Sequence, residues 1–95
     1  MIVVGMDHFL SICKKKLVEW YNEAFDNMSV YIQEKIDLSQ VYVVWSCKTL
    51  QNYKAMLSTA VSGDGIYVEF TYNGDKQELY MDVYHKLVNQ KITEE

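Results

Sequence analysis

The 95-residue sequence contains no proline and no arginine, so all nine of its positive charges are lysines. Arginine is the side chain that binds phosphates and guanine edges in a bidentate manner, and its absence argues against specific DNA reading and phosphate clamping. The net charge of −4 adds to this, because non-specific affinity for nucleic acid comes from neutralising phosphate charges. The composition therefore counts against a nucleic-acid partner.

Motifs for cofactors and metals are missing as well. None of the four glycines belongs to a dinucleotide or P-loop signature, and no cysteines or histidines have zinc-site spacing. The turns at 63–65 and 73–75 lack the full set of oxygen ligands that calcium requires. Carboxylates are present, but no identifiable Ser/His/Asp relay accompanies them. We predict no cofactor, no metal and no enzymatic activity.

Long apolar runs are also lacking. No stretch approaches the ~20 apolar residues of a membrane span, and the opening segment from Met1 to Gly5 lacks the basic flank of a signal peptide. Cys13 and Cys47 are the only cysteines, and their apolar neighbours predict two buried, reduced thiols. Together these features predict a protein of the cytoplasm with no membrane contact.

What the sequence does contain is enough apolar material for a folded core. Hydrophobic residues make up 49% of the chain, which excludes intrinsic disorder. Apolar residues from Leu10 to Tyr21 recur with helical spacing and predict an amphipathic helix over about 7–26, with Asp7 as its N-cap. Weaker patterns predict a short helix or an ordered connection at 28–37, and a short helix or an edge segment at 85–92.

From residue 41 the apolar period changes to two, which is typical of strands. The connections are a loop over 50–53, a turn over 62–65, and Asn73-Gly74, which predicts a type I′ turn with positive φ at both residues. Three short connections in succession make neighbouring strands antiparallel. We predict a single α+β domain over 1–95, with the helix packed on a four-stranded antiparallel meander at about 41–49, 54–61, 66–73 and 77–84.

Alternation divides this sheet into two faces. One face is apolar, centred on Trp45 and Phe70, and we expect the helix to cover it. The other mixes tyrosines with carboxylates and lysines, and tyrosine is enriched where proteins bind partners. The candidate binding residues of that face are Tyr42, Lys48, Tyr67, Glu69, Glu78, Tyr80, Asp82 and Tyr84, and the adjoining loop adds Gln51, Asn52 and Tyr53.

A tyrosine-rich sheet face has more than one interpretation. It can bind another protein, close a homodimer or stack a planar ligand between aromatic rings. Alternatively, the tyrosines stabilise the sheet by pairing across strands, or the chain beyond residue 85 folds over them. The sequence leaves these alternatives open.

Similarity to a known family runs through three segments, VWSCKTLQNYKA at 44–55, LST at 57–59 and TYNGDK at 71–76. These segments resemble a family of small uncharacterised proteins from phages and prophages of low-GC Gram-positive bacteria. The resemblance covers about residues 41–86, and the helix is similar only in pattern. That family is a domain of unknown function, so the resemblance implies a phage context and brings no catalytic residues.

The first hypothesis for function is a non-enzymatic, phage-type binding protein that inhibits or redirects a host protein. A counter-defence factor, anti-CRISPR-like or directed at another immune system, acting in the host cytoplasm, fits this description. The second hypothesis is a sponge that sequesters a nucleotide immune signal. The third is an accessory protein of phage replication or recombination that contacts single-stranded DNA through aromatic side chains.

Overall fold

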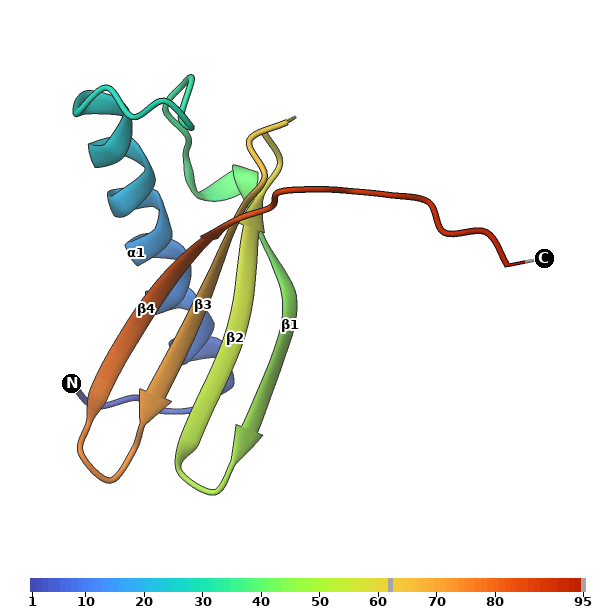
Figure 1. Cartoon of the computed structure of the whole chain (residues 1–95). Helices are drawn as coiled ribbons and strands as arrows, with labels where there is room; N and C mark the ends of the chain where they lie inside the picture. Colours follow the sequence, from blue (N-terminus) through green and yellow to red (C-terminus); the bar gives the residue numbers. More distant parts are fainter. Residues whose placement is uncertain (62, 95) are drawn as a thin grey trace.

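A computed structural model describes residues 1–61 and 63–94 and shows one helix packed on one face of a four-stranded sheet (Figure 1). The strands lie in the order β1-β2-β3-β4, each antiparallel to its neighbour, which confirms the predicted α+β meander. The elements are α1 (Met6–Asp26), the 3-10 helix η1 (Leu38–Gln40), β1 (Val41–Thr49), β2 (Asn52–Thr59), β3 (Ile66–Asn73) and β4 (Glu78–His85).

Helix α1 joins the sheet through a single stripe of side chains. Phe9, Cys13, Leu17 and Tyr21 have no exposed surface, and their four-residue spacing places them on one side of the helix. The ring of Phe9 stacks on that of Tyr53 in β2, with the ring centroids 5.3 Å apart. The core of the molecule therefore lies between α1 and the helix-facing side of the sheet.

Both ends of α1 are set by backbone conformation. The helix begins at Met6, and Gly5, with φ of 89°, occupies the N-cap position without a side-chain cap. The predicted N-cap, Asp7, is instead an acidic residue of the first turn, where the helix dipole favours it. After the helix, Met28 adopts a left-handed φ of 62°, which is incompatible with continuing an α-helix.

Residues 27–37 form an ordered connection without a helix, so of the two alternatives predicted for 28–37 the ordered connection is confirmed and the short helix is wrong. The amide of Asn22 holds this connection in place. Its nitrogen donates to the carbonyl of Ile36 at 2.9 Å, and its oxygen accepts from the Ile36 N–H at 2.8 Å. Ile32 and Ile36 are buried against the core, and their four-residue spacing imitates the helical period that misled the prediction.

A β-bulge in β1 changes which side chains face the helix. Val43 pairs with Leu57, but Trp45 pairs with the next residue along β2, Met56, so Val44 is an extra residue in the ladder. Beyond a bulge the alternation of faces shifts by one position. Trp45 therefore lies on the face away from α1, and its predicted place in the core is wrong.

The same shift corrects the positions of two further residues. Lys48 pairs with the buried Tyr53 on the helix side, and its ammonium group lies 5.6 Å from the centre of that ring. Cys47 pairs with Lys54 on the opposite face and is exposed, whereas the sequence predicted a buried thiol. Cys13 is buried as predicted.

The β1–β2 and β3–β4 turns both differ from their predicted lengths. The β1–β2 turn consists of Leu50 and Gln51 only, because β2 spans Asn52–Thr59 and not 54–61. The β3–β4 turn has four residues, 74–77, and its left-handed residue is Gln77, with φ of 55°. The type I′ turn predicted at Asn73-Gly74 is therefore wrong, although the hairpin itself forms as expected.

Gly74 is needed for a close approach and not for a positive φ. A Cβ atom at this position would lie 2.1 Å from the carbonyl oxygen of Gln51, far inside van der Waals contact. The Gly74 N–H donates to the side-chain oxygen of Asn52 at 2.9 Å, and the side chain of Gln51 is hydrogen-bonded to Asp75. These contacts fasten the two turns to each other at one end of the sheet.

The β2–β3 connection is anchored by a buried carboxylate, Asp64. It accepts hydrogen bonds from the hydroxyl of Tyr21 at 2.8 Å, from the hydroxyl of Thr59 and from the Ile66 N–H at 3.0 Å. Burial, and then the hydrogen bond to this carboxylate, raises the pKa of Tyr21 well above its usual value, so the phenol remains a donor at neutral pH. Ser62, where the predicted turn begins, lies outside the described residues.

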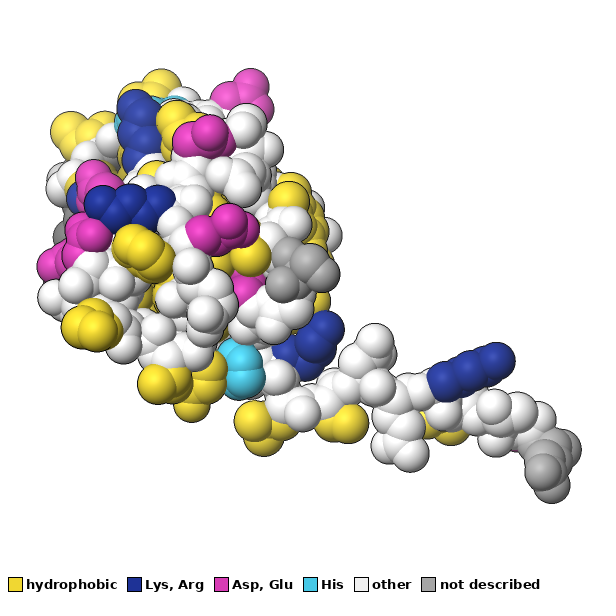
Figure 2. Space-filling view, turned by 90° about the horizontal axis from the view of Figure 1, so that it is seen from above, with side chains coloured by type: hydrophobic (Ala, Val, Ile, Leu, Met, Phe, Trp, Pro, Cys, Tyr) yellow, Lys and Arg dark blue, Asp and Glu magenta, His cyan; other side chains and the backbone are white. Residues whose placement is uncertain are grey.

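Residues 86–94 leave the sheet as an extended tail (Figure 1). Figure 2 shows the tail standing clear of the rest of the molecule, with hydrophobic side chains along it; these include Leu87, Val88 and Ile92, all exposed. No helix forms within 85–92, so the short helix predicted there is wrong. The alternative in which this segment folds back over the tyrosines is wrong too.

Candidate binding surface on the open face of the sheet

The face of the sheet opposite α1, here called the open face, is not covered by any described element (Figure 1). Cross-strand pairing arranges its side chains in rows that run across all four strands. The three complete rows are Tyr42, Ser58, Tyr67 and Tyr84; Trp45, Met56, Glu69 and Asp82; and Cys47, Lys54, Thr71 and Tyr80.

Large aromatic side chains lie near both edges of this face. Tyr42 and Trp45 in β1 are 46% and 39% exposed, and Tyr80 and Tyr84 in β4 are 55% and 50% exposed. Tyr67 lies between them in β3 and is half-buried. Tyrosine and tryptophan combine a large apolar area with a polar group and few rotatable bonds, so they lose little entropy when a partner covers them.

The charge on the open face is predominantly negative. Glu69 and Asp82 lie directly opposite each other on β3 and β4, and Lys54 compensates only one of them, with its Nζ 3.8 Å from Glu69. Within the four strands, all of which the structure describes, Lys54 is the one cationic side chain here. Near the turn, the hydroxyl of Tyr80 donates to Glu78, and this hydrogen bond raises the pKa of Tyr80. A partner with basic groups would suit this surface.

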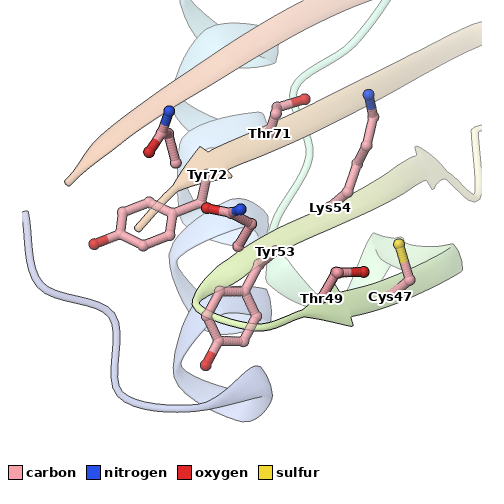
Figure 3. A pocket seen from close by; sticks show the side chains of 8 residues that line it. Cys47, Thr49, Tyr53, Lys54, Thr71 and Tyr72 are labelled. Atoms are coloured by element: carbon pink, nitrogen blue, oxygen red, sulfur yellow. The ribbon is translucent and has the colours of Figure 1, made fainter. Parts of the chain in front are cut away.

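A shallow hollow of about 330 Å³ lies near the turn end of the open face (Figure 3). Figure 3 shows Cys47, Thr49, Lys54 and Thr71 projecting from the strands on one side of the sheet, while Tyr53 points to the other side, towards α1. The polar groups that line it include two threonine hydroxyls, the amides of Asn52 and Asn73, one ammonium and one thiol. Such a lining can accept one side chain of a partner, but it offers only one positive charge for a phosphate.

The structure gathers most of the predicted binding residues on one face. Those on the open face are Tyr42, Tyr67, Glu69, Glu78, Tyr80, Asp82 and Tyr84. Lys48 and Tyr53 are not among them, because both face the helix. Gln51 lies in the β1–β2 turn and fastens it to the β3–β4 turn. Asn52 makes a second contact between these turns and also lines the hollow at the turn end of the open face. Sequence reasoning missed Trp45 and Cys47. The bulge in β1 places both on the open face, and the alternation of the sequence does not reveal a bulge.

The two cysteines should differ sharply in reactivity. Burial raises the pKa of Cys13 from 9.0 to about 12, so at pH 8 it is a protonated, enclosed thiol. We expect a thiol reagent at pH 8 to label only Cys47 in the folded protein and both residues in denaturant, as measured by mass spectrometry. Labelling of Cys13 in the folded protein at a rate similar to Cys47 would contradict the buried position.

The raised pKa also gives a direction for alkaline stability. The folded state binds the Cys13 proton more tightly than the unfolded state, so this group favours folding below pH 9. Its contribution to the free energy of unfolding is lost as the pH rises from 9.0 towards about 12.

Two other kinds of feature are absent from the described part of the chain. Across residues 1–61 and 63–94, no group of three or more His, Cys, Asp or Glu side chains is arranged to hold a metal ion. In the same residues, the single α-helix is too polar over its length to cross a membrane. The open face is therefore the candidate site with the largest set of exposed recognition side chains.

The fold and this surface define a two-layer α+β domain in which one helix covers one side of a meander sheet and the other side is bare. A family of unknown function, DUF6275, matches residues 10–94, and the chain belongs to this family. Comparison with curated proteins and with solved structures found no match. The match begins within α1 and runs through the sheet into the tail.

Proposed function

We propose that this chain is a non-catalytic binding protein whose contact surface is the open face of its sheet, and that its partner is a protein carrying basic and aromatic or aliphatic groups. The observation that carries the proposal is the set of exposed aromatic side chains, Tyr42, Trp45, Tyr80 and Tyr84, on a sheet face that nothing in residues 1–61 and 63–94 covers. The strands of this face carry three carboxylates and one lysine, so the face is complementary in charge to a partner with basic groups.

The resemblance to small phage and prophage proteins supports a more specific role. Inhibition or redirection of a host protein, for example a component of a bacterial defence system, requires tight binding and no chemistry. A surface of this kind is sufficient for such a role. On this proposal the host protein contributes the basic groups, and the complex forms in the cytoplasm of the host cell.

The nucleotide sponge and the DNA accessory protein have less support. The hollow near the turns offers one ammonium group, that of Lys54, and Glu69 lies 3.8 Å from it. Bound nucleotides and single-stranded DNA both require several positive groups along their phosphates. The aromatic residues alone could stack on bases, but they would not neutralise the phosphate charges.

The test uses a double variant on β1. Tyr42→Ala with Trp45→Ala removes two exposed aromatic side chains from the open face, and the matched control is Tyr31→Ala, an equally exposed tyrosine in the 27–37 connection. The wild-type chain is used to isolate its partner from a host lysate, and the purified partner is then titrated with each variant by calorimetry. We expect the double variant to bind about 10- to 100-fold more weakly, which corresponds to about 1–3 kcal/mol.

The control variant should bind as tightly as the wild type, because the ring of Tyr31 packs against that of His85, on the helix side of the sheet, and is not part of the open face. The circular dichroism spectrum of each variant verifies that it is folded. If the double variant is folded and binds the partner with wild-type affinity, the open face is not the contact surface and the proposal fails.

A further inference from the structure

The outer edge of β4 is an unprotected edge strand. Strand β4 pairs with β3 on one side only, and no described element pairs with its other side. Natural proteins protect such edges with lysine, proline, a bulge or an inward-pointing charge. The sequence of β4, Glu78–His85, contains no lysine and no proline, its register with β3 is uninterrupted, and its helix-side residues Leu79, Met81 and Val83 are apolar. The opposite edge, β1, carries a bulge.

The hydrogen bond between Lys86 and Gly65 shows which residues of β4 bond to β3 and which direct their backbone groups outwards. The Lys86 N–H donates to the carbonyl of Gly65 at 2.7 Å, which continues the register that pairs Ile66 with His85. In an antiparallel ladder the backbone groups of alternate residues point to the same side. The even-numbered residues of β4 therefore bond to β3, and Leu79, Met81 and Val83 direct their N–H and C=O groups outwards.

The helix-side surface of β4 is also incompletely covered. The equivalent positions of the neighbouring strand, Val68 and Phe70, are fully buried, but their partners Val83 and Met81 are 37% and 38% exposed. The core thus ends in an apolar margin directly beside the free edge. A second strand along this edge would satisfy the outward backbone groups and cover the margin in one step.

We propose that the chain forms a homodimer in which β4 pairs antiparallel with β4 of a second copy, joining the two sheets into one, with Met81 opposite Met81 at the two-fold axis. This pairing goes beyond the proposed function, since it uses the edge of the sheet and not its open face. A symmetric antiparallel pair is isologous, so the same edge serves both copies and the assembly closes as a dimer.

A second copy of β4 can pair with this edge in a register that places no like charges opposite each other. With Met81 at the axis, Tyr80 lies opposite Asp82, Leu79 opposite Val83, and Glu78 opposite Tyr84, so no two like charges meet. An axis at Asp82 would place that carboxylate against itself, and an axis at Tyr80 would place Glu78 against Asp82. An axis at Val83 would pair only residues 81–85 of each strand. The sequence of β4 is therefore self-complementary in the register that uses nearly its whole length.

The decisive experiment is a charge swap at the axis. Sedimentation equilibrium between about 1 µM and about 1 mM covers dissociation constants of ordinary specific complexes. We expect the wild type to have twice the 11.2 kDa mass of one chain. Met81→Lys and Met81→Glu should each be monomeric, because like charges then face each other across the axis, and an equimolar mixture of the two should regain the dimer mass. The matched control is Val44→Lys, at a similarly exposed position on the β1 edge, which should stay dimeric.

Several results would overturn this dimer. A wild type that stays monomeric throughout the range excludes it, and so does a folded Met81→Lys variant that remains dimeric. A mixture of the two charge variants that does not associate excludes the axis at Met81. Loss of the dimer on truncation after Lys86, with Met81→Lys still dimeric, would assign the interface to the tail. None of these outcomes bears on partner binding through Tyr42 and Trp45, so the two proposals fail separately.

Disulfide cross-linking provides a second measurement that does not depend on charge. Hydrogen-bonded antiparallel pairs have Cα atoms about 5.5 Å apart, which is within the range that a disulfide spans. In a Cys47→Ser background, Met81→Cys should therefore form a covalent dimer on mild oxidation. Leu79→Cys in the same background should not, because the two copies of residue 79 would lie roughly 13 Å apart along the strands. Equal cross-linking at both positions would contradict the register.

Discussion

Phe9→Ala is expected to cost about 3–5 kcal/mol of the free energy of unfolding, the range typical of a buried phenylalanine reduced to alanine. Phe9 has no exposed surface and stacks on Tyr53, so its ring lies between α1 and β2 at the centre of the two-layer contact. Its loss leaves a cavity that α1 cannot close by itself, because the helix is also held at Tyr21, three turns away. We expect the melting temperature to fall by roughly 20 °C.

The matched control for this change is Phe25→Ala on the last turn of the same helix. Phe25 is 36% exposed, so the same truncation there should cost less than about 1 kcal/mol. Urea denaturation followed by circular dichroism gives both values. Similar losses at residues 9 and 25 would show that the helix does not pack on the sheet through the Phe9 stripe.

Asp64→Ala is expected to cost about 3 kcal/mol, because it leaves buried donors without an acceptor. The hydroxyls of Tyr21 and Thr59 and the N–H of Ile66 all donate to this carboxylate. Together they tie α1, the end of β2 and the start of β3 into one corner of the molecule. Thermal denaturation should show a melting temperature lower by roughly 15 °C.

A double-variant cycle separates this network from a general loss of packing. Tyr21→Phe alone removes one donor and should cost about 1 kcal/mol. In the Asp64→Ala background the same change should cost almost nothing, because the acceptor of the phenol is already gone. If the two losses are additive, Tyr21 and Asp64 are not coupled and the corner is held by other contacts.

Sequence alone predicted the class of fold because the two signals that carry it are local. The helical period over Phe9 to Tyr21 and the period of two from Val41 onwards reflect burial along one element at a time. The short connections then left antiparallel neighbours as the only simple arrangement. The spacing of Ile32 and Ile36 shows the limit of this approach. Both are buried, but they lie in a connection without a helix, which the side chain of Asn22 in α1 holds by two hydrogen bonds to the backbone of Ile36.

The face on which each candidate residue lies was predicted correctly on β3 and β4, and wrongly on the part of β1 beyond its bulge. Glu69, Tyr80 and Asp82 lie on uninterrupted strands, where alternation alone fixes the face. Trp45 and Lys48 lie beyond the bulge at Val44, where one extra residue exchanges the two faces. Val44 and its neighbours carry no sequence signal for a bulge. The bulge is visible only in the pairing of β1 with β2.

The sequence by itself determined that this protein is a helix on an antiparallel meander, and that one face of the sheet is rich in tyrosine and carboxylate. It did so because burial imposes a period on each element, and a period can be read along the chain. Only the tertiary structure decided that Trp45 belongs to the open face, that Gly74 is required by the backbone of Gln51, and that β4 ends in a free edge. Each of these depends on which residue of another strand lies opposite, and that pairing is a property of the assembled sheet.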